Sequence, residues 1–373
     1  MNMVGIVRRR TFAWVCWAAA CLGSMTCGPA SAQVGAPWTD VHVHLIGGST
    51  QRVDYGAAIG VALAAMDESG VRTSVVMPPP QIKEMALHDW REFAALLQRH
   101  PCRFAFLGGG GTLNVMLHEA AKVREVDAAK RAEFARVAQE ILSAGAAGFG
   151  EMAAHHLSLQ HGHAYEWVAP DHPLLLLLAD IAARNNAVID LHLDLVPSDT
   201  GPPPRLQSTN PAVLRENRAA FERLLAHNRQ AKIVWAHAGS DPLGNWTWSL
   251  SRELLAAHPN LYMSLRLPGR MPGRVKPGAA GGFMPHFIVG PGGDINPGWL
   301  RVLREFPDRF VIGSDQFFAN PAMSGSGPGL DAARFNANAR ALTRRLIEQM
   351  PPDLARPITI DNAAQLYRLQ TAR

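Results

Sequence analysis

The chain has 373 residues, of which 47% are hydrophobic and 18% are charged, enough for a large buried core in one barrel-sized domain or two smaller ones. Its 36 basic residues outnumber its 31 acidic ones, but Arg8, Arg9 and Arg10 lie in a segment that we expect to be removed. The remaining 33 basic residues against 31 acidic ones give a net charge of about +2, which leaves no electrostatic case for nucleic-acid binding.

The N-terminal segment has the layout of a secretory signal peptide. The three arginines precede an apolar run over residues 11–22, and Ala30-Ser31-Ala32 supplies small residues for cleavage. The apolar run is shorter than a transmembrane helix requires, so we expect no membrane span in the mature chain. Arg9-Arg10-Thr11-Phe12 partly resembles a twin-arginine export signal. We therefore expect residues 1–32 to be a signal peptide, residues 33–373 to be a single domain, and the mature protein to be exported to the periplasm.

The first strand of the mature chain is expected at Asp40-Val41-His42-Val43-His44 and to end in a metal site. Its apolar residues suit a buried strand, and side chains two positions apart on a strand point the same way, so His42 and His44 should project together. Neutral imidazole nitrogen is a good ligand for a zinc-type cation. The pair alone could also be a polar strand face, so the interpretation depends on ligands at later strands.

From Asp40 onward, apolar strand-like runs alternate with helical patterns. The strand-like runs begin at Asp40, Val71, Cys102, Ala146, Val188, Ile233, Leu261 and Phe310. The helical patterns cover residues 55–68, 82–99, 127–142, 174–184, 213–228, 250–257, 299–305 and 332–349, while 113–126 stays unassigned. Strict alternation with near-continuous apolar strands favours a parallel sheet covered by helices. Eight such units in roughly 330 residues predict an α/β fold, a (β/α)₈ TIM barrel with long loops at its C-terminal face.

Polar residues of interest lie at the carboxyl ends of these strands. They are His42 and His44 on the first, Glu151 on the fourth, His192 on the fifth, His237 on the sixth and Asp315 on the eighth. In a barrel these ends converge on one mouth, so the six side chains should share one pocket. Four further histidines after the fourth strand, at positions 155, 156, 161 and 163, are interpreted as part of a solvated loop rather than as a second metal site.

At these positions the chain resembles the amidohydrolase superfamily, in its amidohydrolase-related (amidohydrolase 2) branch. The matching motifs are Asp40-Val41-His42-Val43-His44, Gly148-Phe149-Gly150-Glu151, Leu191-His192, Trp235-Ala236-His237-Ala238-Gly239, Gly313-Ser314-Asp315 and the closing Asp361-Asn362-Ala363-Ala364-Gln365-Leu366. The resemblance implies a TIM-barrel hydrolase that uses one or two divalent metal ions, with zinc expected. It implies His42, His44 and Asp315 as ligands of one ion, His192 and His237 as ligands of a second, and Glu151 as the bridge between them.

The catalytic roles expected from this resemblance fall on Asp315 and His237. A divalent ion lowers the pKa of its bound water from roughly 15.7 to about 7, and Asp315 could take that water's proton. Glu151 departs from the carboxylated lysine that many binuclear members carry on this strand, and it could instead hydrogen-bond a ligand histidine. Decarboxylases of the branch use one metal and free the histidine at the position of His237 for acid–base work, so the number of ions stays open.

The expected function is hydrolysis of a small carboxylic ester, lactone or amide, with a mononuclear non-oxidative decarboxylase as the alternative. A barrel that has lost catalysis and only binds a ligand is disfavoured, because every expected ligand and Asp315 are present. Arg266 could pair with a substrate carboxylate or form a structural ion pair. Trp246 could form a wall of the substrate pocket or pack at a helix start. The partner is a small-molecule substrate, and whether the chain forms a homo-oligomer stays open.

Overall fold

The computed structural model describes residues 36–46, 53–83, 89–159, 163–240, 242–267, 286–290, 293–319 and 332–370. The expected signal peptide, residues 1–32, lies outside these ranges, and so do His161 and residues 268–285 and 291–292 of the long insertion after the seventh strand. Among the helices of the described ranges, none combines the length and the apolar character needed to cross a membrane.

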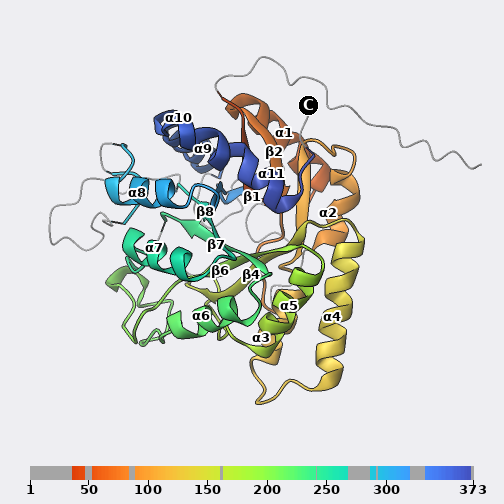
Figure 1. The fold of residues 1–373 in the computed structure, drawn as a ribbon. Coiled ribbons are helices and arrows are strands. Elements are labelled where there is room, and N and C mark those ends of the chain that lie inside the picture. Colours follow the sequence, from red (N-terminus) through yellow and green to blue (C-terminus); the bar gives the residue numbers. More distant parts are fainter. Residues whose placement is uncertain are drawn as a thin grey trace, which may run out of the picture.

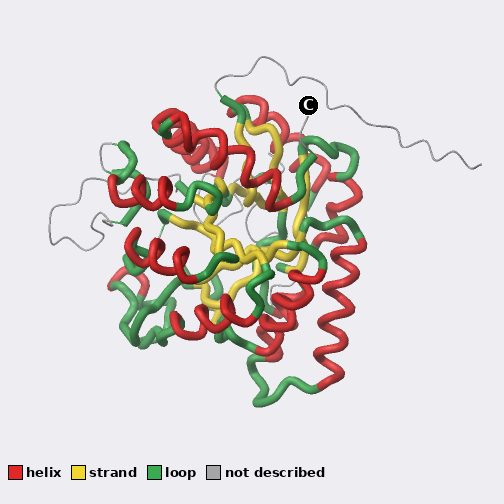
Figure 2. The backbone as a smooth tube through the Cα atoms, viewed as in Figure 1, coloured by secondary structure: helices red, strands yellow, loops and turns green. Residues whose placement is uncertain are grey.

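Parallel strands form the centre of the molecule, with helices around them (Figure 1; Figure 2). They are β1 (Trp38–His44), β2 (Val71–Val76), β3 (Phe104–Gly109), β4 (Gly148–His156), β6 (Val188–Leu193), β7 (Lys232–Ala238), β8 (Leu261–Leu265) and β9 (Phe310–Ile312). Each strand pairs in parallel with the next one of this series. The eight strand regions predicted from the sequence are therefore confirmed.

The last strand position is divided between two short strands. β9 pairs with β8, while β10 (Gln316–Phe317) pairs in parallel with β1, and only residues 313–315 separate the two. The backbone N–H of Asp315 also donates to the carbonyl of His42 at 2.9 Å, and that of Phe318 donates to the carbonyl of His44 at 2.7 Å. The eighth strand position thus lies against both its neighbours, and the fold is the predicted (β/α)₈ barrel.

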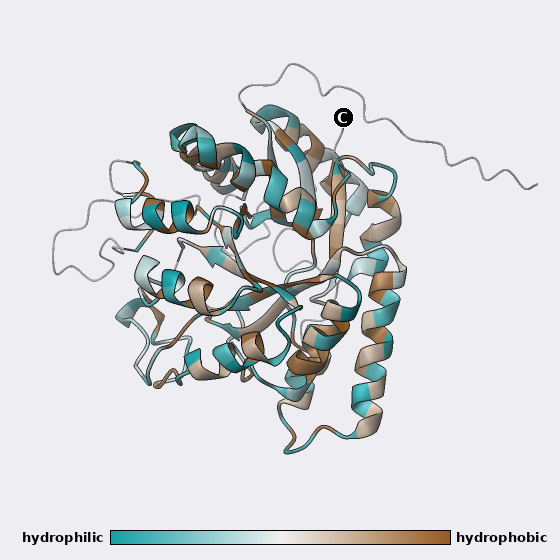
Figure 3. Cartoon of the chain, viewed as in Figure 1, coloured by the Kyte–Doolittle hydropathy of each residue, from teal (hydrophilic) through white to brown (hydrophobic). Residues whose placement is uncertain are grey.

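The helices cover the outside of the barrel (Figure 1). They are α1 (Tyr55–Ser69), α2 (Trp90–Leu97), α3 (Leu113–Ala120), α4 (Ala128–Ser143), α5 (Pro173–Arg184), α6 (Arg218–His227), α7 (Trp248–Ala257), α8 (Pro297–Glu305), α9 (Ala332–Gln349), α10 (Pro352–Arg356) and α11 (Asn362–Tyr367). Hydrophobic and hydrophilic residues occur along the same helices in Figure 3, as is typical of helices with one buried face.

Two helices begin later than the sequence predicted, each because a polar side chain fixes the backbone before it. The Asp89 carboxylate accepts hydrogen bonds from the N–H groups of Trp90 and Gly109, so α2 begins at Trp90 rather than at residue 82. The buried Asn217 side chain accepts from Val196 N–H and donates to the carbonyl of Asp194, so α6 begins at Arg218 rather than at residue 213. Asp89 bonds to the first residue of its helix, as residues that precede a helix often do, whereas Asn217 is held by bonds to the segment after β6.

Helix α3 lies in the stretch that the sequence pattern left unassigned. Its buried face mixes apolar residues with Asn114 and His118, which interrupt the apolar periodicity. Both side chains contact Glu166 of the short strand β5 (Glu166–Trp167), with Asn114 Nδ2 at 3.0 Å and His118 Nε2 at 3.2 Å from its Oε2. Burial raises the pKa of Glu166 to about 7 and lowers the pKa of His118 to about 4, so near pH 5.5 this contact joins two neutral groups.

Strand β4 corrects two expectations. The sequence suggested that it ends at Glu151, but it continues to His156, because β6 pairs with it as far as His155 and β5 pairs antiparallel with its last two residues. His155 and His156 therefore lie on a strand, and His155 is fully buried. The interpretation of these two histidines as solvated loop was wrong, since the antiparallel pairing of β5 is not visible in the apolar pattern.

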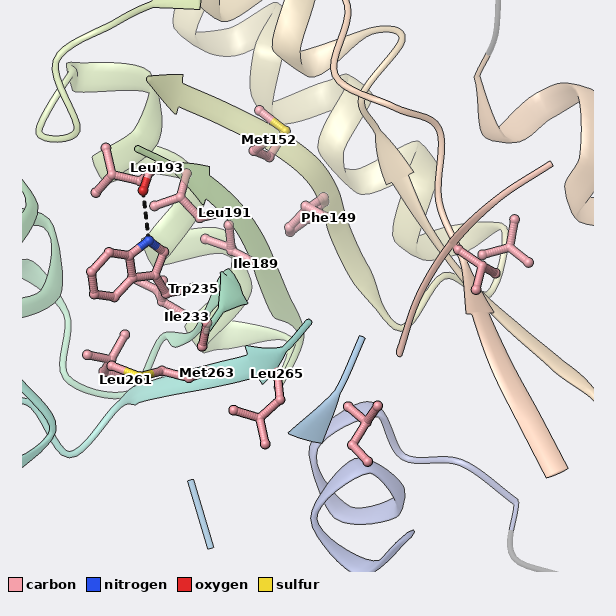
Figure 4. Close-up of a cluster of buried hydrophobic side chains, with 14 of the residues drawn as sticks. Phe149, Met152, Ile189, Leu191, Leu193, Ile233, Trp235, Leu261, Met263 and Leu265 are labelled. Atoms are coloured by element: carbon pink, nitrogen blue, oxygen red, sulfur yellow. Dashed lines mark hydrogen bonds between the residues drawn. The ribbon is translucent and has the colours of Figure 1, made fainter. Parts of the chain in front are cut away.

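The core has an inner and an outer part. The outer part lies between strands and helices and includes Ile189, Leu191 and Leu193 of β6, with the indole N–H of Trp235 donating to the Leu193 carbonyl at 2.9 Å (Figure 4). The inner part is filled by residues of the strands and closed by α11: Val41, Val75, Met77, Leu107, Ala147, Val188, Val234, Val311, Ala363, Leu366 and Tyr367. Because successive strand side chains alternate, the residues of β6 between the outer ones face the barrel interior.

Candidate metal centre

Four side chains from three parts of the barrel converge at its C-terminal end. The Nε2 atoms of His42 and His44 lie 3.2 Å apart, and Glu151 Oε2 lies 3.4 Å from the first and 3.5 Å from the second. Asp315 Oδ1 lies 3.2 Å from His44 Nε2 and 3.9 Å from His42 Nε2. All four residues are buried. The structure therefore brings together His42, His44 and Asp315, which were expected to bind one ion, and Glu151, which was expected to bridge to a second ion.

The spacing of these donors fits a divalent cation. Ligands at 2.0–2.2 Å from a tetrahedral zinc ion lie roughly 3.3–3.6 Å from one another. The separations in this cluster, from 3.2 to 3.9 Å, are of that size. Two imidazoles and two carboxylates also form a donor set that suits zinc and other divalent ions. His42, His44 and Glu151 form one of the described groups that could hold a metal ion, and His42, His237 and Asp315 form another.

A second group of donors lies on the other side of Glu151. Its Oε1 is 2.8 Å from His192 Nδ1 and 3.2 Å from His237 Nε2, and these three residues also form a group that could hold an ion. The two oxygens of Glu151 thus face different histidine pairs. This is the arrangement that a bridging carboxylate needs, and at these distances each oxygen can also accept a hydrogen bond from an imidazole.

The second ring nitrogens of the histidines differ in what they contact. His44 Nδ1 lies 2.9 Å from the Met77 carbonyl, His42 Nδ1 lies 3.2 Å from Asp190 Oδ1, and His192 Nε2 lies 3.5 Å from Asp194 Oδ2. His237 Nδ1 is buried and has no hydrogen-bond partner among the described residues. Metal-binding histidines ordinarily present their second ring nitrogen to an acceptor, and three of the four rings have one within 3.5 Å, although the contact between His42 and Asp190 is an ion pair without hydrogen-bond geometry.

Sequence reasoning missed Asp190 and Asp194. Asp190, His192 and Asp194 occupy alternate positions, two residues apart, on and just after β6. On a strand this spacing places all three side chains on one face, here the barrel interior, while the apolar residues between them face the helices. The alternation of charged and apolar residues around His192 was the signal that could have identified both carboxylates.

Two of the six predicted site residues have unusual backbone conformations. Among the described non-glycine residues, four have positive φ, and these include His237 at 73° and Asp315 at 55°. The left-handed region is uncommon for residues with a Cβ, and such conformations concentrate at functional sites. His237 lies within β7 at the irregularity in its pairing with β8 between Trp235 and Ala238, and Asp315 lies between the paired residues of β9 and β10.

The cluster's electrostatics follow from burial and close opposite charges. Burial opposes ionisation of Glu151, but the charge of His42 and hydrogen bonds from His192 and His237 hold its pKa well below the usual range. Burial also opposes ionisation of Asp315, while the Arg266 charge keeps its pKa below the usual range. Burial lowers the pKa of His237 to about 4. Ionised carboxylates and a neutral imidazole are the forms that bind a cation.

His192 and His42 behave differently from His237. Burial opposes protonation of His192, but hydrogen bonds from its ring to Asp194 and Glu151 raise its pKa to about 10. Burial likewise opposes protonation of His42, and the charges of Asp190 and Glu151 raise its pKa well above the usual value. Without a cation, the neighbouring carboxylates therefore favour the protonated form of both rings. A cation that takes their lone pairs must displace protons, so cation binding should release them.

The two expected substrate contacts lie in different surroundings. Arg266 Nη2 lies 2.7 Å from Asp315 Oδ2, its side chain is 18% exposed, and its buried Nε has no hydrogen-bond partner in the described part of the chain. Trp246 is buried, stacks on Trp235 with ring centroids 3.5 Å apart, and donates from its indole N–H to Ser251 Oγ at 2.9 Å. Arg266 is thus part of the cluster, whereas the surroundings of Trp246 match the packing alternative.

A row of imidazoles extends the cluster beyond the six predicted residues. The His156 ring centroid lies 4.1 Å from that of His192 and 4.6 Å from that of His163. The row continues from His192 to His237 at 4.8 Å and from His237 to His42 at 4.9 Å. His156 and His163, which the sequence analysis set aside as loop residues, therefore lie directly beside the site.

Comparison with known proteins gives one family match. A model of the amidohydrolase family matches residues 40–369. No curated protein matches the sequence.

The solved structures to which the chain is similar include three enzymes. One is a 2,6-dihydroxybenzoate decarboxylase from Rhizobium, with 12% identity, a TM-score of 0.48, and coverage of 90% of this chain and 99% of that one. Another is a 5-carboxyvanillate decarboxylase from Novosphingobium aromaticivorans complexed with manganese, with 11% identity, a TM-score of 0.46, and coverage of 90% and 97%. The third is a 4-oxalomesaconate hydratase from Rhodopseudomonas palustris, with 14% identity, a TM-score of 0.46, and coverage of 89% and 95%.

Proposed function

The chain belongs to the amidohydrolase family, and from this premise we propose that it is a hydrolase that cleaves a small carboxylic ester, lactone or amide with the help of divalent cations, most simply zinc. The observation that carries the proposal is the position of Glu151, whose two carboxylate oxygens face two different histidine pairs. Adjacent donor sets that share one carboxylate suit two ions, and paired ions are common in enzymes that hydrolyse such bonds.

The residues that would hold the ions divide into two sets. His42, His44 and Asp315 would hold the first ion, His192 and His237 the second, and Glu151 would contribute one oxygen to each. A bound divalent cation supplies a water of lowered pKa and polarises the substrate's carbonyl group. The protein contributes buried, fixed donors, because every one of these side chains comes from a barrel strand or the residues directly after one.

Asp315 is proposed as the group that moves the proton. One of its oxygens, Oδ2, is held by Arg266 at 2.7 Å, which leaves Oδ1 directed toward His44 and the first donor set. A carboxylate fixed in this way can accept a proton from water on one side and return it to the leaving group. Arg266 has a further N–H, at Nε, without a partner among the described residues, and we propose that it binds a substrate carboxylate.

A second candidate function, a mononuclear decarboxylase, is favoured by one observation. The buried Nδ1 atoms of His42 and His237 both lack a hydrogen bond in the described residues, but His42 Nδ1 has the Asp190 carboxylate at 3.2 Å, whereas no such contact is seen for His237 Nδ1. A ring without that support is less well fixed as a metal ligand and more able to act in proton transfer. If His237 does not bind a metal ion, the first donor set would hold a single ion.

Metal content separates the two candidates. The purified protein, freed of loosely bound ions, is analysed by elemental mass spectrometry alongside His237→Asn and its matched variant His192→Asn. Two equivalents in the wild type and loss of one in both variants support the hydrolase. One equivalent that survives in His237→Asn supports the decarboxylase. A wild-type protein that binds no divalent ion would overturn both candidates. Once the metal content is known, a screen of esters, lactones, amides and carboxylates identifies the substrate class.

A further inference from the structure

Asp190 is a buried carboxylate for which the proposed reaction gives no direct role. It lies on β6 inside the barrel, and its exposed fraction is 0%. Its Oδ1 is 3.2 Å from Nδ1 of His42, which is also 0% exposed. Neither Asp190 oxygen makes a hydrogen bond in the described ranges, so the contact with His42 is an ion pair, and the inner core of the barrel beside it is apolar. Because an isolated buried carboxylate is strongly unfavourable, its contact with the His42 ring requires an explanation.

The His42 ring has two nitrogens that face different surroundings. Nε2 points to His44, Glu151 and Asp315, the donors of the first cation set. Nδ1 points to Asp190. A neutral imidazole carries its proton on only one nitrogen, and the position of that proton is set by the acceptor that the ring meets. A carboxylate at Nδ1 holds the proton there and leaves the lone pair of Nε2 free for a cation.

Two glycines make room for this pair. A Cβ on Gly150 would lie 2.9 Å from the Asp190 Cβ, and a Cβ on Gly313 would lie 2.9 Å from the His42 Cβ. Contacts that short require a neighbouring side chain to move. The strands on both sides of the pair are therefore shaped to admit it, since a side chain at either glycine would displace Asp190 or His42.

We infer that Asp190 is a positioning residue for His42: its carboxylate fixes the ring and its tautomer so that Nε2 faces the first cation position. The inference rests on the proposed function, because it assumes that the His42 donor set binds a cation. Contacts of this kind behind a ligand histidine are generally worth 10-fold to 100-fold in metal affinity. Removing Asp190 should therefore weaken cation binding without touching a ligand atom.

The test measures Zn²⁺ affinity and folding stability separately, on the full chain stripped of metal. Zn²⁺ dissociation constants are determined by competition with a chromogenic chelator for the wild type, Asp190→Ala and Asp190→Asn. Melting temperatures are measured without metal. We expect Asp190→Ala to raise the first Zn²⁺ dissociation constant about 10-fold to 100-fold. We expect Asp190→Asn to raise it less, because its amide oxygen can accept a hydrogen bond from His42 Nδ1–H.

Tyr367→Phe is the matched control. Tyr367 of α11 is buried in the same inner core. Burial, and after it the Asp190 charge, raises the pKa of Tyr367, which shows that the two residues are near each other. Tyr367 belongs to none of the donor sets. The Tyr367→Phe variant should bind Zn²⁺ with the affinity of the wild type. Unchanged Zn²⁺ affinity in both Asp190 variants, with or without a lower melting temperature, would overturn the inference and leave the proposed function standing. A wild-type protein that does not bind Zn²⁺ would instead refute the proposed function.

Discussion

Replacing Asp315 with asparagine separates the chemistry of the site from its ability to hold a cation. Asparagine has nearly the same size and keeps one oxygen ligand, but it cannot accept a proton at neutral pH. The other donors of the first set are unaffected: His42 Nε2, His44 Nε2 and Glu151 Oε2 lie 3.2 to 3.5 Å from one another and remain able to hold an ion. We therefore expect Asp315→Asn to fold and to retain bound metal.

The expected loss of turnover can be estimated from the role of Asp315. A positioned acid–base group usually contributes a factor of about 10² to 10⁴ in rate. At 1.36 kcal/mol per tenfold, this corresponds to roughly 2.7–5.4 kcal/mol of the activation barrier. Burial and the 2.7 Å contact with Arg266 hold the carboxylate in one orientation, so no other described side chain of the cluster is placed to replace it. The effect should therefore appear in kcat.

The assay combines metal analysis with steady-state kinetics on the first substrate that the screen identifies. Arg266→Gln is the control, because it breaks the contact with Asp315 but leaves the carboxylate, and it should mainly raise KM if Arg266 binds the substrate. Near wild-type turnover in Asp315→Asn with full metal content would refute the reasoning. If that variant retained decarboxylation alone, the proton chemistry would move to His237.

Four further outcomes are expected. His42→Ala should lose metal and activity together, as measured by elemental analysis and turnover of the same preparation, since it removes a donor rather than a proton acceptor. Burial raises the pKa of Glu166 from 4.5 to about 7. Its contribution to the free energy of unfolding is therefore fully present below pH 4.5 and is lost as the pH rises through 7. The loss is at most about 3 kcal/mol. Glu166→Gln should remove that pH dependence, as measured by the free energy of urea unfolding at pH 5 and pH 8. The same difference between the two pH values in the variant and the wild type would contradict the prediction. Trp246→Ala should lower the free energy of unfolding by about 3–5 kcal/mol, while Trp246→Phe leaves KM unchanged; a raised KM would restore its role as a substrate contact. N-terminal sequencing of the protein from its native host should find a start near Gln33, and a start at Met1 would refute the expected signal peptide.

The barrel could be predicted because its determinants are local and periodic. Each strand is a short apolar run bounded by a helical pattern, and eight repeats of that unit identify the fold before any contact is known. The site residues were predictable for a related reason. His42, His192 and His237 stand on strands rich in buried apolar residues, and residues at the strand ends of a barrel must converge.

The parts that the sequence did not reveal depend on contacts between distant segments. The alternation of Asp190 and His192 along β6 is visible in the sequence, but only the structure places the Asp190 carboxylate against His42, about 150 residues away in the chain. His156 reads as loop because the antiparallel pairing with β5 that extends β4 leaves no periodic signal. The role of Trp246 turns on its stacking against Trp235, a contact between a strand and the loop that follows it. In each case the decisive information is which surfaces meet, and apolar periodicity does not record it.

The division of the last strand position between β9 and β10 has a consequence for biosynthesis. The donors of the first set come from β1, from β4 and from the junction between β9 and β10, so His42 emerges from the ribosome 273 residues before Asp315 (315 − 42). At ~5–20 residues per second, the interval is about 14–55 s. Throughout it, β1 has no partner on one edge and its two imidazoles lack a carboxylate from the last strand position. Arrival of residues 313–317 supplies the missing ligand and the missing strand together. Closure of the barrel and completion of the proposed first donor set therefore depend on the same short segment, and a nascent chain halted before Asp315 has neither.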